Sequence, residues 1–153
     1  MKGIKFFGVL MLAVCLASSC DKNGLDDTQE VYLEVNANNI SGKWELVEAN
    51  GSALVEGMFV YLEIVRNDRT FTLYQNHNGF MDDARIMTGS YNLDTDPELG
   101  AIIRGVYDHD SGDWDHRYII KDLTATKMTW IAKDDPSYIQ VFSRIDSIPV
   151  ASE

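Results

Sequence analysis

Hydrophobic and polar residues alternate with a period of two along most of the chain after Gly42, which is the pattern of half-buried β-strands. In the first such segment, Trp44 and Leu46 alternate with the charged residues Lys43 and Glu45. No segment shows a convincing amphipathic stripe with the helical period. The alternation predicts eight strands, over residues 42–50, 58–66, 70–77, 84–93, 101–108, 114–121, 127–133 and 137–145.

The segments between these strands are short and carry residues that favour turns. Asn50-Gly51-Ser52, Asn67-Asp68 and Asp134-Asp135-Pro136 are examples. Strands joined in sequence by such turns form an antiparallel meander, and eight strands can close into an up-and-down barrel that leaves no edge exposed. We therefore predict an all-β fold, with a single eight-stranded antiparallel β-barrel over residues 40–146 and a C-terminal tail over residues 147–153.

The directions of the strands divide the barrel into two ends. Because the first and last strands run in opposite directions, Trp44 and Arg144 are predicted to lie at the same, closed end. The loops at 51–57, 78–83, 109–113 and 134–136 then lie at the opposite, open end. The inward-facing candidates to bind a ligand near that end are Glu48, Gln75, Trp114, His116, Tyr118, Trp130, Tyr138 and Gln140.

The first nineteen residues have the features of a secretory signal peptide. A basic start with Lys2 and Lys5 precedes an uninterrupted apolar run over residues 6–17, which is too short to span a bilayer as a helix. Ser18 and Ser19 then supply the small residues that a signal peptidase requires. Residues 1–19 are therefore expected to be a leader and not part of the folded domain.

Cys20 follows the predicted cleavage site. The segment Leu16-Ala17-Ser18-Ser19-Cys20 resembles the lipobox of bacterial lipoproteins, and the resemblance implies that Cys20 is acylated, with chains such as palmitate. Cys15 leaves with the leader, so the mature chain has one thiol and can form no internal disulfide, which also favours the anchor. Secretion without acylation is the alternative. With the anchor, the protein is expected to be exported and attached to the bacterial outer membrane.

Residues 20–39 are predicted to be the lipidated cysteine and a flexible tether. Residues 21–30 are polar and lack periodicity. Their acidic side chains resemble the surface-export signal of some Gram-negative lipoproteins, and a solvated linker is the alternative interpretation. The short apolar segment 31–35 is expected to lie against the domain.

The formal net charge of −11 argues against nucleic acid and anionic lipid surfaces as partners, because both attract basic proteins. Many acidic residues fall in the loops predicted at the open end, and such a rim favours neutral or cationic ligands over fatty carboxylates. The frequency of aspartate in turns is the alternative explanation. These acidic residues are Glu56, Asp82, Asp83, Asp108, Asp110, Asp113, Asp134 and Asp135, with Arg85 and Lys133 as nearby cations.

The order of these features is similar to that of a known family. A meander that begins with Gly42-Lys43-Trp44 and ends with Phe142-Ser143-Arg144 resembles the lipocalins of the calycin superfamily, and is most similar to the lipocalin-like domain of small bacterial lipoproteins. The resemblance implies a barrel closed at one end by Gly42, Trp44 and Arg144, with the arginine packed on the indole. It also implies a small hydrophobic or amphiphilic ligand in the lumen. The Thr-Asp-Tyr motif typical of lipocalins is not evident, so the resemblance does not specify that ligand.

The densest polar cluster of the sequence, residues 108–116, matches no standard metal-binding loop. Gly112 and Asp113 stand where a calcium loop has its third ligand and its glycine. His109 and His116, with nearby carboxylates, could hold a transition metal, but their spacing fits no standard site. The sequence also lacks a nucleophile motif and a phosphate-binding loop. We therefore predict no metal, no cofactor and no enzymatic activity.

Two functions are compatible with these predictions. The first is a membrane-anchored protein that binds a small, largely apolar, neutral or cationic ligand inside the barrel. The second is an interaction module, in which the barrel is filled by its own side chains and the open-end loops bind another surface protein or a glycan. The volume of the lumen distinguishes the two functions. A ligand-binding barrel needs a pocket of about 300 Å³ or more, whereas a filled barrel has no such space.

Overall fold

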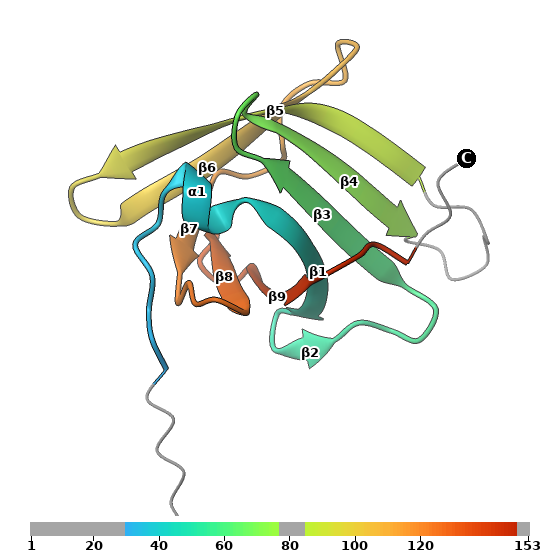
Figure 1. The fold of residues 1–153 in the computed structure, drawn as a ribbon, viewed down its shortest axis with the longest axis horizontal. Coiled ribbons are helices and arrows are strands. Elements are labelled where there is room, and N and C mark those ends of the chain that lie inside the picture. The colour runs from blue at the N-terminus through green and yellow to red at the C-terminus, as the bar shows by residue number, and fades with distance from the viewer. Residues whose placement is uncertain (1–29, 77–84, 150–153) are drawn as a thin grey trace, which may run out of the picture.

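The computed structural model describes residues 30–76 and 85–149, and these residues form an all-β fold (Figure 1). The predicted leader, Cys20, most of the tether and the loop at 78–83 lie outside the described residues. The elements are α1 (Ala37–Ile40), β1 (Gly42–Ala49), β2 (Ser52–Ala53), β3 (Phe59–Val65), β4 (Thr70–Asn76), β5 (Arg85–Asp96), β6 (Gly100–Tyr107), β7 (Tyr118–Lys121), β8 (Lys127–Ala132) and β9 (Ile139–Ile145).

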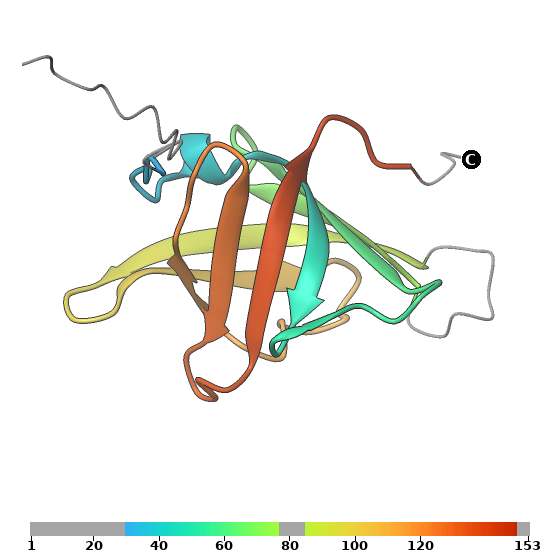
Figure 2. The same ribbon diagram turned by 90° about the horizontal axis from the view of Figure 1, so that it is seen from below.

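Eight of the strands close into an antiparallel barrel, which confirms the predicted fold class. The strands β1 and β3 to β9 pair in chain order, and β1 also pairs with β9 to close the ring. Figure 2 shows β8, β9 and β1 side by side at this closure. The remaining strand, β2, is a two-residue extension paired with the end of β1. The alternation pattern does not predict β2, because two residues are too few to show a period.

The structure shortens the predicted sixth strand, at residues 114–121, to β7. Regular pairing begins at Tyr118, and residues 114–117 lie in the connection that leads to β7. Among the described residues, β6 and β7 pair at two positions before they separate. Where they separate, the backbone N–H of Trp114 donates to the carbonyl oxygen of Gly105 at 2.9 Å. The alternation at 114–117 therefore comes from a partly buried connection and not from a strand.

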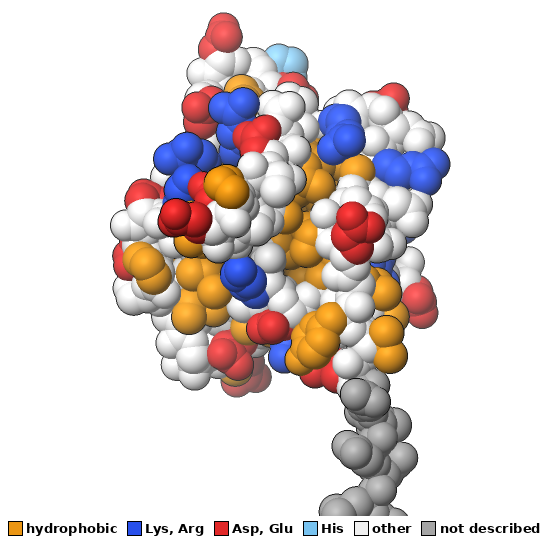
Figure 3. Space-filling view, turned by 90° about the vertical axis from the view of Figure 1, so that its left-hand side faces the viewer, with side chains coloured by type: hydrophobic (Ala, Val, Ile, Leu, Met, Phe, Trp, Pro, Cys, Tyr) orange, Lys and Arg blue, Asp and Glu red, His pale blue; other side chains and the backbone are white. Residues whose placement is uncertain are grey.

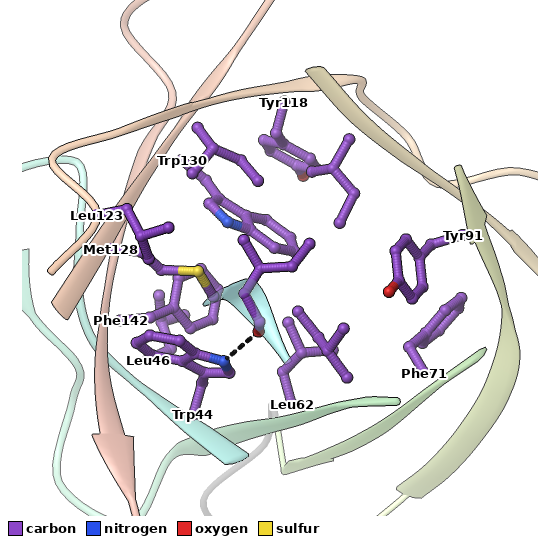
Figure 4. Packing of buried hydrophobic residues seen from close by; sticks show 14 of the residues in the cluster. Trp44, Leu46, Leu62, Phe71, Tyr91, Tyr118, Leu123, Met128, Trp130 and Phe142 are labelled. Atoms are coloured by element: carbon purple, nitrogen blue, oxygen red, sulfur yellow. Dashed lines mark hydrogen bonds between the residues drawn. The ribbon is translucent and has the colours of Figure 1, made fainter. Parts of the chain in front are cut away.

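Helix α1 is a single turn that the sequence pattern does not predict. Asn36 caps it by accepting hydrogen bonds from the backbone N–H groups of Asn38 and Asn39, each at 3.0 Å. At its last residue, the carbonyl oxygen of Ile40 accepts a hydrogen bond from Nε1 of Trp44 at 2.9 Å (Figure 4). Four residues cannot display a helical period, so α1 is recognisable only from its cap and its contacts.

The end of the barrel that contains Trp44 is filled with side chains (Figure 4). Ile40 from α1, Trp44 from β1 and Met128 from β8 have no solvent-exposed surface. Leu123, which precedes β8, is 2% exposed and belongs to the same cluster. Close packing of this kind leaves no room for a ligand. This end of the barrel is therefore closed.

The outer surface carries charges of both signs. On the face that includes the turn between β5 and β6, charged side chains surround a recess lined by hydrophobic ones (Figure 3). Lys133 Nζ lies 3.1 Å from Asp96 Oδ2, and Arg104 Nε lies 3.5 Å from Asp94 Oδ2. Within the described ranges, the protein has no helix with the length and hydrophobicity needed to cross a bilayer.

Candidate ligand-binding cavity

The half of the barrel opposite Trp44 contains a cavity of about 350 Å³. Its lining comes from most of the barrel strands and from the connections after β1 and β6. The aliphatic lining residues are Leu46, Ala49, Leu54, Met58, Val60, Leu62 and Leu73. The aromatic ones are Phe71, Tyr107, Trp114, Tyr118, Trp130, Tyr138 and Phe142, and the polar ones are Gln75, Asp115 and Gln140.

Aromatic side chains form a continuous wall of the cavity. The ring centroids of Trp114 and Trp130 are 5.5 Å apart, and that of Tyr118 lies 5.2 Å from that of Trp130. Phe71 packs edge-on against Trp114 at 4.9 Å, and Phe142 lies 4.9 Å from Trp130. Tilted and edge-on contacts of this kind are favourable and restrain each ring. The wall therefore offers a ligand a preformed surface of aromatic faces and edges.

A glycine in β6 makes the position of Trp114 possible. A Cβ atom on Gly105 would overlap the indole of Trp114, so this indole lies directly against the backbone of the strand. Trp114 thereby reaches the cavity wall although its own backbone lies outside the paired strands. The sequence gives no sign of this contact, because no periodicity relates a strand residue to a residue in an irregular connection.

Four uncharged polar side chains also line the cavity, namely Gln75, Tyr118, Tyr138 and Gln140. None of these side chains makes a hydrogen bond with a described residue. Gln75 is 9% exposed and Tyr118 is 8% exposed. Burial raises the pKa of the Tyr118 hydroxyl, and the nearby Tyr138 and Asp115 raise it further. The Tyr118 hydroxyl therefore stays protonated at neutral pH and can donate a hydrogen bond.

Six of the eight candidates named from the sequence lie in the cavity lining, namely Gln75, Trp114, Tyr118, Trp130, Tyr138 and Gln140. Glu48 does not, because the pairing of β1 with β9 shifts register between Leu46 and Glu48. The extra residue, Val47, forms a bulge that changes the phase of the strand. As a result Ala49, and not Glu48, follows Leu46 on the inner face.

His116 is not among the residues that line the cavity, although its ring lies against two that are, Tyr118 and Tyr138. The His116 ring packs at the rim, 5.1 Å from that of Tyr138 and 5.9 Å from that of Tyr118. Its Nδ1 lies 3.1 Å from both carboxylate oxygens of Asp134. A backbone hydrogen bond and this contact with His116 lower the pKa of Asp134. His116 therefore links the loop after β8 to the aromatic wall.

Asp115 is exposed to solvent, as the alternation pattern predicts, and it also borders the cavity. In a regular strand it would face away from the inward Trp114, but this segment lies outside the paired strands. Its charge adds to the effect of burial in raising the pKa of Tyr107, which also borders the cavity. Among the described residues of the lining, Asp115 is the one with a formal charge. A periodicity argument could not identify it, because its position depends on an irregular connection.

At the closed end, Arg144 and Trp44 make the contact expected from the sequence. The guanidinium carbon of Arg144 lies 4.1 Å from the centroid of the Trp44 indole. The guanidinium also occupies the space that a Cβ atom on Gly42 would need. Gly42 has a φ of 128°, which side-chain-bearing residues rarely adopt. Gly42 therefore makes room for the arginine, and not only for a close approach of two strands.

The polar cluster at 108–116 does not gather into a metal site. Within residues 30–76 and 85–149, no three His, Cys, Asp or Glu side chains are close enough together to hold a metal ion. Thr88 Oγ1 donates instead to Asp108 Oδ2 at 2.7 Å. His109 and Asp110 have positive φ angles of 60° and 56°, as in a tight turn.

An eight-stranded antiparallel barrel that is packed at one end and hollow at the other belongs to the class of barrels that hold small molecules in the lumen. The family model for the lipocalin-like domain matches residues 40–130, so the chain belongs to the lipocalin-like domain family. This fold generally binds small hydrophobic ligands. A search of curated proteins finds no match to the chain.

Proposed function

We propose that this protein is an exported, lipid-anchored binding protein that holds a small, largely apolar, neutral or cationic molecule in the open half of its barrel. The observation that carries the proposal is the cavity of about 350 Å³ with its aromatic wall. This volume lies near the lower end of the range for ligand pockets. A compact molecule is therefore a better match than a large one.

The lining favours association by burial of apolar surface. Each square ångström of apolar surface removed from water contributes about 25 cal/mol, so a molecule enclosed by these side chains gains several kcal/mol. Loss of translational and rotational freedom offsets part of this gain. Micromolar affinity, which corresponds to about 8 kcal/mol, is the expected range.

The cavity favours this function over that of a filled barrel acting through its loops. A filled barrel would have large side chains along the whole lumen, whereas here the packed cluster occupies the end near Trp44 and the other end is hollow. We also propose binding and not catalysis. Among the described lining residues there is no histidine, cysteine or lysine, and Asp115 has no second ionised group beside it in the lining. Acid–base chemistry commonly requires two such groups.

A cavity-filling substitution tests the binding proposal. The neutral fluorophore N-phenyl-1-naphthylamine should bind the mature domain and gain fluorescence. Ala49 lines the cavity, so Ala49→Phe should reduce that affinity tenfold or more. Ala53 is exposed in β2 and serves as the matched control, because Ala53→Phe adds the same ring outside the barrel. Equal affinities for the wild type and both variants would contradict binding inside the lumen.

The proposed anchor rests on the leader and on Cys20, and the course of the described chain from residue 30 onward supports the orientation proposed for it. The backbone N–H of Leu33 donates to the carbonyl oxygen of Leu123 at 2.7 Å, so the chain enters along the closed end of the barrel. An anchor at Cys20 would then leave the cavity mouth facing away from the membrane. Detergent phase partitioning of the protein from its native host should place the wild type in the detergent phase and Cys20→Ser in the aqueous phase. Aqueous partitioning of both would refute the anchor.

A further inference from the structure

Besides the indole Nε1 of Trp130, which is buried without a described partner, two polar side chains in the cavity wall are at least nine-tenths buried and make no hydrogen bond with a described residue. They are Gln75 in β4 and Tyr118 in β7. Buried polar groups are hydrogen-bonded in the great majority of proteins, and one left without a partner is unfavourable. An amide and a hydroxyl that line a hollow space therefore take their partners from the contents of that space.

These two groups lie on different sides of the lumen. The strands that carry them, β4 and β7, are separated in the barrel by β5 and β6. Gln75 offers both a donor and an acceptor, and the protonated Tyr118 hydroxyl offers a donor. Gln140 in β9, next to the aromatic wall, offers a second amide that also lacks a described partner. The polar groups thus surround a space that is otherwise bounded by rings and aliphatic side chains.

We propose that the cavity selects a compact, ring-bearing molecule with hydrogen-bonding atoms at its edge, such as an aromatic amide. The inference rests on the proposed function and specifies its ligand class. The ring packs against the indoles of Trp114 and Trp130, and the polar edge pairs with Gln75 and Tyr118. An unbranched acyl chain satisfies none of these lumen groups along its length, and a plain hydrocarbon ring satisfies none at all.

A pair of probes of nearly equal shape separates this proposal from simple apolar binding. Naphthalene and 2-naphthamide share the same fused rings, and the amide adds a donor and an acceptor. A purely apolar cavity binds naphthalene more tightly, because the amide loses its hydrogen bonds to water. We expect the reverse order for this protein, with 2-naphthamide binding about tenfold more tightly by calorimetry. Each hydrogen bond accounts for roughly a three- to tenfold change.

Near-isosteric substitutions then assign the effect to the two side chains. Gln75→Met and Tyr118→Phe remove the hydrogen-bonding groups and keep most of the volume. Each should weaken 2-naphthamide by about three- to tenfold and leave naphthalene unchanged or slightly tighter. Tyr91→Phe is the matched control. The Tyr91 hydroxyl is also buried without a hydrogen-bond partner among the described residues, but Tyr91 does not line the cavity, so both affinities should stay at the wild-type value.

Each outcome bears on the ligand class. Tighter binding of naphthalene than of 2-naphthamide by the wild type would overturn the inference and leave the proposed function intact, since an apolar ligand still binds. If 1-dodecanol binds but neither naphthalene nor 2-naphthamide does, the inference is likewise overturned and the proposed function stays intact. Failure of all three probes to bind a folded domain would overturn both. The comparison of wild-type affinities decides the matter even if a variant fails to fold.

Discussion

At the scale of single residues, Arg144 of β9 contacts the stretch from α1 to β1 and the loop before β8, at the closed end of the barrel. Its guanidinium lies over the Trp44 indole and donates to the carbonyl oxygens of Asn39 and Ser41 at 2.7 Å each. Its Nε donates to the carbonyl oxygen of Ala125 at 2.8 Å. These carbonyl groups belong to α1, to the residue after it and to the loop before β8, while Arg144 itself belongs to β9. One side chain thus satisfies backbone acceptors that the strand ladder does not reach.

Trp44 and Arg144 are expected to stabilise the fold jointly. Trp44→Ala should lower the free energy of unfolding by about 3–5 kcal/mol, because it removes a fully buried indole. Arg144→Met should also destabilise the protein, since it leaves three carbonyl groups with fewer donors. In a double-mutant cycle measured by urea denaturation, the coupling should be about 0.5–2 kcal/mol, the range for a cation over an aromatic ring. Additive effects would mean that the contact at 4.1 Å contributes nothing to stability.

At the scale of elements, the sequence predicts the regularly alternating strands and fails where the chain departs from alternation. The period of two identifies eight barrel strands and places Trp130 and Gln140 correctly in the lining. Within β1, one extra residue at Val47 reverses the phase, and no sequence pattern marks such a bulge. The connection at 114–117 alternates like a strand but is held by the hydrogen bond from the Trp114 N–H to the Gly105 carbonyl and by the indole that packs against Gly105. Irregular segments depend on tertiary contacts, so Asp115 could be identified only from the structure.

The hairpin of β5 and β6 contains a carboxylate whose ionisation supports its turn. Asp96 accepts hydrogen bonds from the backbone N–H groups of Glu98 and Leu99, at 3.0 and 3.1 Å, and lies 3.1 Å from Lys133 Nζ. The two backbone donors, followed by Lys133, lower the pKa of Asp96 below its unfolded value of 3.8. A carboxylate with a lowered pKa stabilises the fold above the unfolded value, and this contribution is lost as the pH falls through the folded value.

Asp96→Asn should therefore lower the melting temperature at pH 7. The difference from the wild type should shrink as the pH is reduced below 3.8, because Asp96 becomes protonated first in the unfolded chain and then, at lower pH, in the folded protein. Thermal unfolding followed by circular dichroism between about pH 7 and about pH 2.5 measures both effects. Asp94→Asn is the matched control, since its ion pair with Arg104 is exposed and should contribute little. A constant difference at every pH would rule out ionisation of Asp96 as the source of its effect.

At the scale of the whole molecule, negative charge predominates, and acidic residues lie at the mouth of the cavity. The formal net charge is −11, and the described mouth includes Asp115 in the cavity lining and Asp134 beside His116 at the rim. Lys133, which the sequence suggests as a cation near the mouth, forms an ion pair with Asp96. Asp82 and Asp83, the other predicted rim acids between β4 and β5, lie outside the described residues. A mouth with this balance of charge attracts cations and repels anions.

Three amphiphiles with the same twelve-carbon chain test this balance. Dodecyltrimethylammonium should bind the mature domain more tightly than 1-dodecanol, and dodecanol more tightly than laurate, because headgroup charge is the main difference among them. Trp114 and Trp130 line the cavity, so their fluorescence reports the titrations, which are made below the micellar concentration. The spread of affinities should narrow when salt is raised to about 0.5 M, since exposed charges are screened beyond about 8 Å already at physiological ionic strength. Asp115→Asn should also narrow the spread of the three affinities, even at low salt. Laurate binding as tightly as the cation at low salt would contradict any role of the acidic mouth in ligand choice.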